Sequence, residues 1–147
     1  MRILTLAVVA LMVGACTSTP QPTQTPVVVC ALVPNMDELV GKTAVGPPGG
    51  FTLNDIDRCI WSYATDPARS IGVSVGPVGG HGGAIDNLGD GEAIPGLGED
   101  ARWWAGNRLL SVAVGDRALQ VDIQLDEADV SKDLAVSIAE SALENLH

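Results

Sequence analysis

The feature that most constrains the fold is the pattern of residues 109–125, in which two apolar segments flank a short turn. Residues 109–114 and 118–125 are separated by Gly115 and Asp116, a pair typical of a tight β-hairpin. In the second segment apolar side chains alternate with polar ones: Leu119, Val121, Ile123 and Leu125 on one face, Gln120, Asp122 and Gln124 on the other. This period of two predicts an antiparallel strand pair with one buried and one solvated face.

A helix is predicted after this hairpin. Ser131 or Asp129 stands where a capping residue would begin it. The apolar residues that follow recur at spacings of three and four and form one stripe: Leu134, Ala135, Ile138, Ala139, Ala142, Leu143 and Leu146. Such a stripe needs an apolar surface to cover, and we expect that surface to be the open face of the sheet.

Two further strands and a short helix are expected upstream. Residues 59–63 and 70–76 have the composition or the alternation of strands. Asn35 can cap a short helix, with Glu38 as the reciprocal partner and Gly41 as its end. The chain is therefore predicted to be an α+β domain, with a mainly antiparallel sheet packed by a short N-terminal and a longer C-terminal helix.

The first residues are typical of a cleavable export signal. Arg2 precedes an apolar run over residues 3–13, which is shorter than the ~20 residues that a membrane-spanning helix needs. The small residues Gly14 and Ala15 then precede Cys16, and this segment resembles a lipobox, whose cysteine is lipidated and becomes the new N-terminus. An ordinary secretory signal is the alternative. We expect anchoring through Cys16 at the extracytoplasmic face of the cell membrane.

These features divide the chain into three parts. Residues 1–15 form the predicted signal peptide, and residues 16–26 comprise Cys16 and a tether. The tether beyond Cys16 contains only Thr, Ser, Pro and Gln, a composition that favours an extended segment without a core. Residues 27–147 form the single predicted domain.

Cys30 and Cys59 remain once Cys16 is assigned to the anchor. In an exported protein two such cysteines favour a disulfide. A metal site and a free catalytic thiol are the alternatives, but a metal site needs further ligands, and the histidines are limited to His81 and His147. We therefore expect no metal and no cofactor.

Two motifs invite a catalytic or metal-binding interpretation without the context it requires. Residues 72–76 match the Gly-x-Ser-x-Gly pattern, and His81 begins a His-Gly-Gly sequence. A nucleophile elbow needs a strand, a sharp turn and a helix, whereas these residues lie in a predicted strand. Residues 86–92 are rich in Asp and Gly, but Leu88 and Leu97 stand where calcium-binding oxygens are needed. The chain is not expected to be an enzyme.

Charge and aromatic residues limit the partners. A net charge of −10 with scattered acidic residues argues against nucleic acid. Trp103 and Trp104 are adjacent, so on a strand they would point to opposite faces, with one in the core and the other partly exposed. The second indole would then offer a surface for an apolar ligand or a partner.

The whole pattern resembles a family of small exported actinobacterial lipoproteins that share a domain of unknown function. The residues that carry the resemblance are the lipobox cysteine and the Thr/Pro tether, Cys30-Ala31-Leu32 before the short helix, Cys59-Ile60-Trp61, Ile94-Pro95-Gly96-Leu97-Gly98, Ala101-Arg102-Trp103, the paired strands and the terminal helix. The glycine-rich stretch 76–91 departs from it. The resemblance implies a Cys30–Cys59 disulfide and a PsbP/Mog1-type sandwich.

The resulting functional expectation is a membrane-anchored envelope lipoprotein that binds another envelope component without catalysis. The alternative is a carrier or sensor of a small apolar envelope ligand, held between sheet and helix near Trp103 or Trp104.

Overall fold

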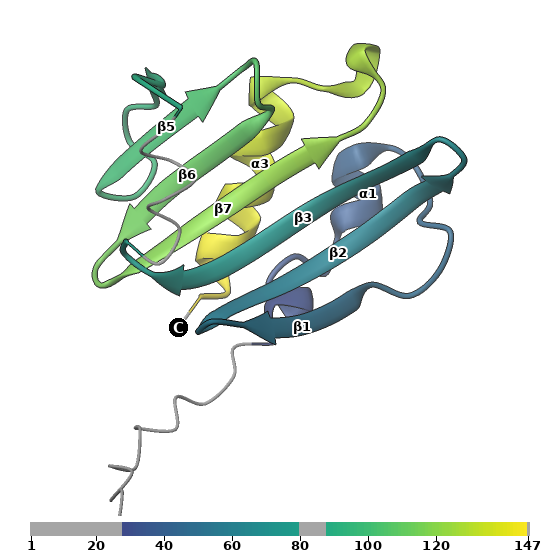
Figure 1. Ribbon diagram of the computed structural model, residues 1–147, viewed down its shortest axis with the longest axis horizontal. Coiled ribbons are helices and arrows are strands. Elements are labelled where there is room, and N and C mark those ends of the chain that lie inside the picture. Colours follow the sequence, from purple (N-terminus) through teal and green to yellow (C-terminus); the bar gives the residue numbers. More distant parts are fainter. Residues whose placement is uncertain (1–27, 80–87, 147) are drawn as a thin grey trace, which may run out of the picture.

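The computed structural model describes residues 28–79 and 88–146 of the chain. Their strands form one antiparallel sheet in the order β1-β2-β3-β7-β6-β5-β4 (Figure 1). The strands are β1 (Gly49–Leu53), β2 (Ile56–Thr65), β3 (Ala68–Pro77), β4 (Glu92–Ala93), β5 (Asp100–Trp104), β6 (Leu109–Val114) and β7 (Arg117–Gln124). The helices are α1 (Met36–Val40) and α3 (Lys132–Glu144), with 3₁₀ turns η1 (Val29–Ala31) and η2 (Glu127–Asp129).

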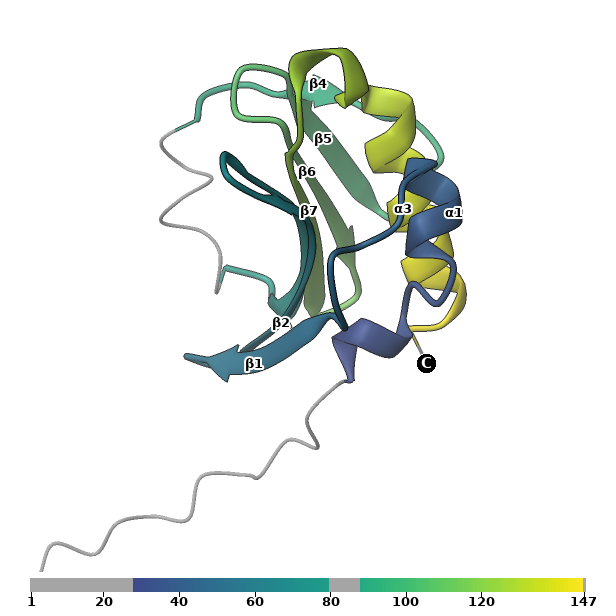
Figure 2. The same cartoon turned by 90° about the vertical axis from the view of Figure 1, so that its right-hand side faces the viewer.

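Both α-helices lie on the same side of the curved sheet, as Figure 2 shows. The predicted α+β class, with a mainly antiparallel sheet and a short and a long helix, is confirmed. The core lies between these two layers. Its strand residues are those of the apolar alternation, among them Val73, Leu110, Val121 and Ile123, all fully buried.

The predicted hairpin is confirmed. β6 and β7 pair antiparallel and flank Gly115 and Asp116. Gly115 has φ +58°, a left-handed conformation that glycine adopts at little cost. β7 occupies the centre of the sheet because β3 pairs with its other edge, so the strand with the clearest alternation carries the core on its apolar face.

Helix α3 also follows the prediction. Ser131 is its N-cap, and the Ser131 Oγ accepts a 3.0 Å hydrogen bond from the backbone N–H of Leu134. The side chains of Ala135, Ile138, Ala139 and Ala142 are fully buried. Small alanines on this stripe let the helix approach the sheet closely, while Ile138 fills the remaining space.

The short helix is confirmed, but its predicted capping box is wrong. Gly41 ends α1 in the left-handed conformation, at φ +68°. Asn35 makes no side-chain cap bond; its Oδ1 instead accepts a 3.0 Å hydrogen bond from Ser141 Oγ on α3. A tertiary contact between the helices has thus taken the side chain that local capping would use.

Strands β1 and β4 were not predicted. Every residue of β1 is exposed. A strand without a buried face needs no alternation of apolar and polar residues, so its sequence carries no strand pattern. Asn54 and Asp55 both have positive φ and form the turn into β2. β4 has only two residues and pairs with Arg102 and Trp103 of β5. Both strands lie at edges of the sheet, where pairing rather than burial defines them.

Candidate ligand-binding groove

The disulfide predicted between Cys30 and Cys59 is present. The two Cα atoms lie 5.1 Å apart, and the bond links the η1 turn to β2. Cys59 is fully buried on the helix-facing side of the sheet. The bond fixes the N-terminal segment against the sheet at the point where the chain turns toward α1.

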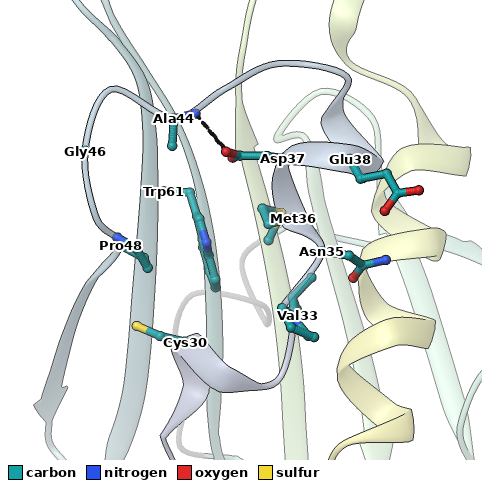
Figure 3. Close-up of a pocket in the computed structure, with 11 residues that line it drawn as sticks. Cys30, Val33, Asn35, Met36, Asp37, Glu38, Ala44, Gly46, Pro48 and Trp61 are labelled. Carbon is teal, nitrogen blue, oxygen red and sulfur yellow. Dashed lines mark hydrogen bonds between the residues drawn. The ribbon is translucent and has the colours of Figure 1, made fainter.

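A groove of about 550 Å³ lies beside this disulfide, between α1, the 44–48 segment and β2. We call it the α1 groove. In Figure 3 Trp61 lies between the 44–48 segment and Met36. The groove is lined by Cys30, Val33, Pro34, Asn35, Met36, Asp37, Glu38, Ala44, Gly46, Pro48 and Trp61.

The base of the α1 groove is apolar and fixed. Val33, Met36 and Trp61 line it, yet each is at most 4% exposed because most of its surface packs in the core. A rigid base formed by core side chains is preorganised, so a ligand would bind without ordering these residues first.

Asp37 holds one wall of the groove in place. Both of its carboxylate oxygens accept hydrogen bonds from the backbone N–H of Ala44, each at 3.2 Å (Figure 3). Its Oδ1 also accepts a 3.2 Å hydrogen bond from the hydroxyl group of Tyr63 on β2. One carboxylate thereby joins α1, the 44–48 segment and the sheet.

The pKa of the Tyr63 phenol is raised well above its ordinary value. Partial burial is the main cause, because it disfavours the phenolate. The hydrogen bond to Asp37 and the negative charge of that carboxylate add to the effect. The Tyr63 hydroxyl therefore remains a hydrogen-bond donor over the physiological pH range.

The expected aromatic surface at Trp103 and Trp104 is absent. The two indoles do point to opposite faces of β5, but Trp103 is 6% exposed and Trp104 is 7% exposed. Trp104 is covered because its indole N–H donates a 2.9 Å hydrogen bond to the Gly89 carbonyl oxygen and its ring packs against Gly91. Neither side chain offers an open surface in this structure.

The other sequence candidates fall into two groups. Gly72 and Ser74 lie inside β3, so the Gly-x-Ser-x-Gly pattern forms no strand–turn–helix elbow. Cys16, His81 and Asp86 lie outside the described residues.

Within residues 28–79 and 88–146, no group of three or more His, Cys, Asp or Glu side chains could hold a metal ion. No helix in the same ranges is long and apolar enough to cross a membrane.

Comparisons of the chain with protein-family models, with curated proteins and with solved structures find no match. The lipoprotein-family resemblance and the sandwich type that it implies therefore stay predictions.

The α1 groove was not predicted from the sequence. Its lining residues come from η1, α1, the 44–48 segment and β2. Trp61 is the single aromatic residue among them. The single available signal was the disulfide, which predicts that the segment after Cys30 lies near Trp61.

Proposed function

We propose that this chain is an envelope lipoprotein anchored at Cys16, and that its domain is a non-catalytic module that binds another envelope component through the α1 groove. The observation that carries the proposal is a preorganised concave site of about 550 Å³, within the size range of ligand-binding pockets. The signal-like N-terminus, Cys16 and the tether support the location.

The composition of the groove agrees with binding rather than catalysis. Its titratable groups are the carboxylates of Asp37 and Glu38, and Asp37 is already occupied by Ala44 and Tyr63. Apolar side chains at the base would contact an apolar group, while Glu38 at the rim would favour a donor or a cation nearby. General acid–base work would need a second group placed against a reacting atom.

A second candidate function is that of a carrier for a small apolar envelope molecule. The observation that favours it is that Val33, Met36 and Trp61 meet at the base of the groove, where each exposes at most 4% of its surface. If the chain is such a carrier, the apolar molecule would lie at Trp61 rather than at Trp103 or Trp104.

Two measurements on the full chain separate the two functions. Native mass spectrometry of the chain purified from envelope membranes would detect a small-molecule adduct, and cross-linking in intact cells would capture a protein partner. Ala44→Trp places a bulky ring in the wall of the groove, and Ala105→Trp in the exposed β5–β6 turn is the matched control.

A cross-linked protein that is lost in Ala44→Trp and kept in Ala105→Trp is the expected result. An adduct with the same dependence would select the carrier. Binding that is insensitive to Ala44→Trp would reject the groove, and hydrolytic turnover lost in Ser74→Ala would reject the non-catalytic assignment.

A further inference from the structure

Strand β1 leaves one edge of the sheet open to solvent. It is the terminal strand of the sheet, and among the described strands it pairs with β2 alone (Figure 1). All of its residues are exposed, and its sequence, Gly-Gly-Phe-Thr-Leu, contains no charged residue and no proline. An exposed edge of this kind is a template on which another strand can pair.

The opposite edge of the sheet is protected. Its strand, β4, has only two residues, and Pro95 follows closely. Glu92 of β4 is charged and accepts a 2.6 Å hydrogen bond from Lys132 Nζ. Short length, charge and proline are the features that keep an edge strand from pairing. One edge of the sheet is thus closed to pairing, and β1 is the edge that remains open.

The outward-facing backbone groups of β1 belong to Gly50 and Thr52. A two-residue turn joins β1 to β2, so the flanking pair Leu53 and Ile56 is a hydrogen-bonded one. Hydrogen bonding alternates along an antiparallel pair, so Gly50 and Thr52 direct their N–H and C=O groups away from β2. No backbone hydrogen bond from another described segment reaches either residue.

The sequence of β1 is complementary to itself. When the strand pairs antiparallel with a second copy about a two-fold axis at Phe51, Gly50 lies opposite Thr52 of that copy. These two residues then bond to each other through the outward-facing N–H and C=O groups. Gly49 lies opposite Leu53 of the second copy. A Cβ atom at Gly49 would meet no atom within 4 Å, so the leucine side chain has space there.

Phe51 meets its own counterpart at the two-fold axis. Because Gly50 and Thr52 form the hydrogen-bonded pairs, the two Phe51 residues form a pair without hydrogen bonds, the type whose side chains lie closest. Phe51 is 49% exposed in the single chain, and aromatic cross-strand pairs are stabilising. Leu53, on the same face of β1, is 63% exposed. Self-pairing therefore covers two large apolar side chains in each copy.

Charge favours a second copy as the strand that pairs with β1. The net charge of −10 opposes contact between two chains over most of their surface. At β1 the neighbouring cation is Arg58, which is paired with Phe51 in register and donates a 3.1 Å hydrogen bond from Nη2 to Asp122 Oδ2. Its charge is balanced within the chain. The edge thus offers no charge to attract a charged partner, and self-pairing places no like charges opposite each other.

The geometry of the pair agrees with two chains anchored in one membrane. The two-fold axis of a continuous antiparallel sheet is perpendicular to the sheet, so corresponding segments of both copies lie on the same side. Cys30 of η1 is bonded to Cys59 on the helix-facing side, and its Sγ would lie 3.2 Å from a Cβ atom on Gly50. Both copies of η1 therefore lie on that side, next to the contact.

We propose that β1 is a dimerisation strand, through which two copies of this chain pair antiparallel and form one continuous sheet. β1 is used up in the contact and β4 is protected, so association stops at a dimer. This contact is independent of the α1 groove and of its ligand. The anchor proposed at Cys16 would confine two chains to one membrane and so raise their effective concentration.

The test combines sedimentation equilibrium with amide hydrogen exchange on the ¹⁵N-labelled full chain in density-matched detergent, over a series of protein concentrations. The contact is small, so we expect a monomer–dimer equilibrium with a Kd of about 0.1–1 mM. The Gly50 and Thr52 amides should become protected as the dimer forms. The Phe51 amide is directed toward β2, and its protection should not follow the protein concentration.

Two variants with the same change of charge make the test specific. Phe51→Glu places two carboxylates opposite each other at the two-fold axis and should weaken dimerisation about tenfold. Val78→Glu is the control, because Val78 is 56% exposed and lies outside β1. It should leave dimerisation unchanged. Mixing Phe51→Glu with Phe51→Lys should restore association, since opposite charges then meet at the axis.

Four outcomes would overturn the proposal. The first is a monomer at every protein concentration up to about 1 mM. The second is protection of Gly50 and Thr52 that does not depend on concentration, which would place another part of the same chain or an added molecule at the edge. The third is equal association of Phe51→Glu and Val78→Glu, as a dimer held by the micelle alone would show. The fourth is growth beyond a dimer. Backbone spectra of each variant establish that its fold is retained.

Discussion

The indole N–H of Trp104 donates a 2.9 Å hydrogen bond to the carbonyl oxygen of Gly89, and this bond joins β5 to the segment that precedes β4. Gly91, two residues further on, lies against the same ring: an added Cβ atom would be 2.7 Å from Trp104 Cε2. A large aromatic side chain on the face without helices is thus covered by backbone. The covering explains why an indole outside the core packing is only 7% exposed.

Replacing Gly91 by alanine should therefore destabilise the domain. The methyl group would displace the Trp104 ring, and overpacking of this kind costs about 1–3 kcal/mol. The measurement is the free energy of unfolding from urea denaturation. Gly106→Ala is the matched control, because a Cβ atom there meets no atom within 4 Å. Equal stability of the two variants would show that the segment containing Gly91 moves away from the Trp104 ring without cost.

Gly98→Ala should be more destabilising than Gly96→Ala. Both glycines have positive φ, +83° at Gly96 and +62° at Gly98, so alanine is strained by about 1–2 kcal/mol at either position. Only at Gly98 would the new Cβ atom also clash, at 2.5 Å from Val112 Cγ1 and 2.6 Å from the Ala113 carbonyl oxygen. Thermal unfolding followed by circular dichroism should rank Gly98→Ala below Gly96→Ala, and the reverse order would contradict the packing described.

Removing the disulfide should lower stability substantially. Cys30 and Cys59 are 29 residues apart, and a cross-link closing a loop of that length contributes about 3–4 kcal/mol by restricting the unfolded chain. We expect Cys30→Ala/Cys59→Ala to shift the urea midpoint of unfolding downward. Reductant should produce a similar shift in the unmodified protein and none in the double variant. A midpoint that does not move would mean that the bond adds nothing to folding.

The raised pKa of Tyr63 predicts a loss of stability in alkali. The folded state holds the phenol proton more tightly than the unfolded state, whose pKa is about 10. This contribution is complete below that pH and is lost as the pH rises above it. Tyr63→Phe should show a smaller decline between pH 9 and pH 11, measured as the free energy of unfolding at each pH.

Tyr63 is the single tyrosine, so the ultraviolet absorbance of the phenolate reports its titration directly. Asp37→Asn should lower its pKa, because the carboxylate charge is removed, while burial keeps it above the ordinary value. An ordinary tyrosine titration in the unmodified protein would contradict the contact between Tyr63 and Asp37.

Several features were predictable from the chain because each rests on local information. The β6–β7 hairpin follows from alternation around Gly115 and Asp116, and α3 follows from its apolar stripe and the Ser131 cap. The Cys30–Cys59 bond was predictable because it is the one pairing left once Cys16 is set aside. In each case the residues that decide the feature are neighbours in sequence or are chemically distinctive.

The tertiary structure decided what depends on distant segments meeting. The Asn35 side chain accepts a hydrogen bond from Ser141 on α3 instead of capping α1. Trp104 is covered by Gly89 and Gly91, which belong to another segment. The Arg58–Asp122 pair joins residues 64 positions apart in the chain, and the α1 groove forms only where η1, α1, the 44–48 segment and β2 meet. Local periodicity determines which face of a strand or helix is apolar, whereas the packing of the whole chain determines what covers each face and which polar groups find partners.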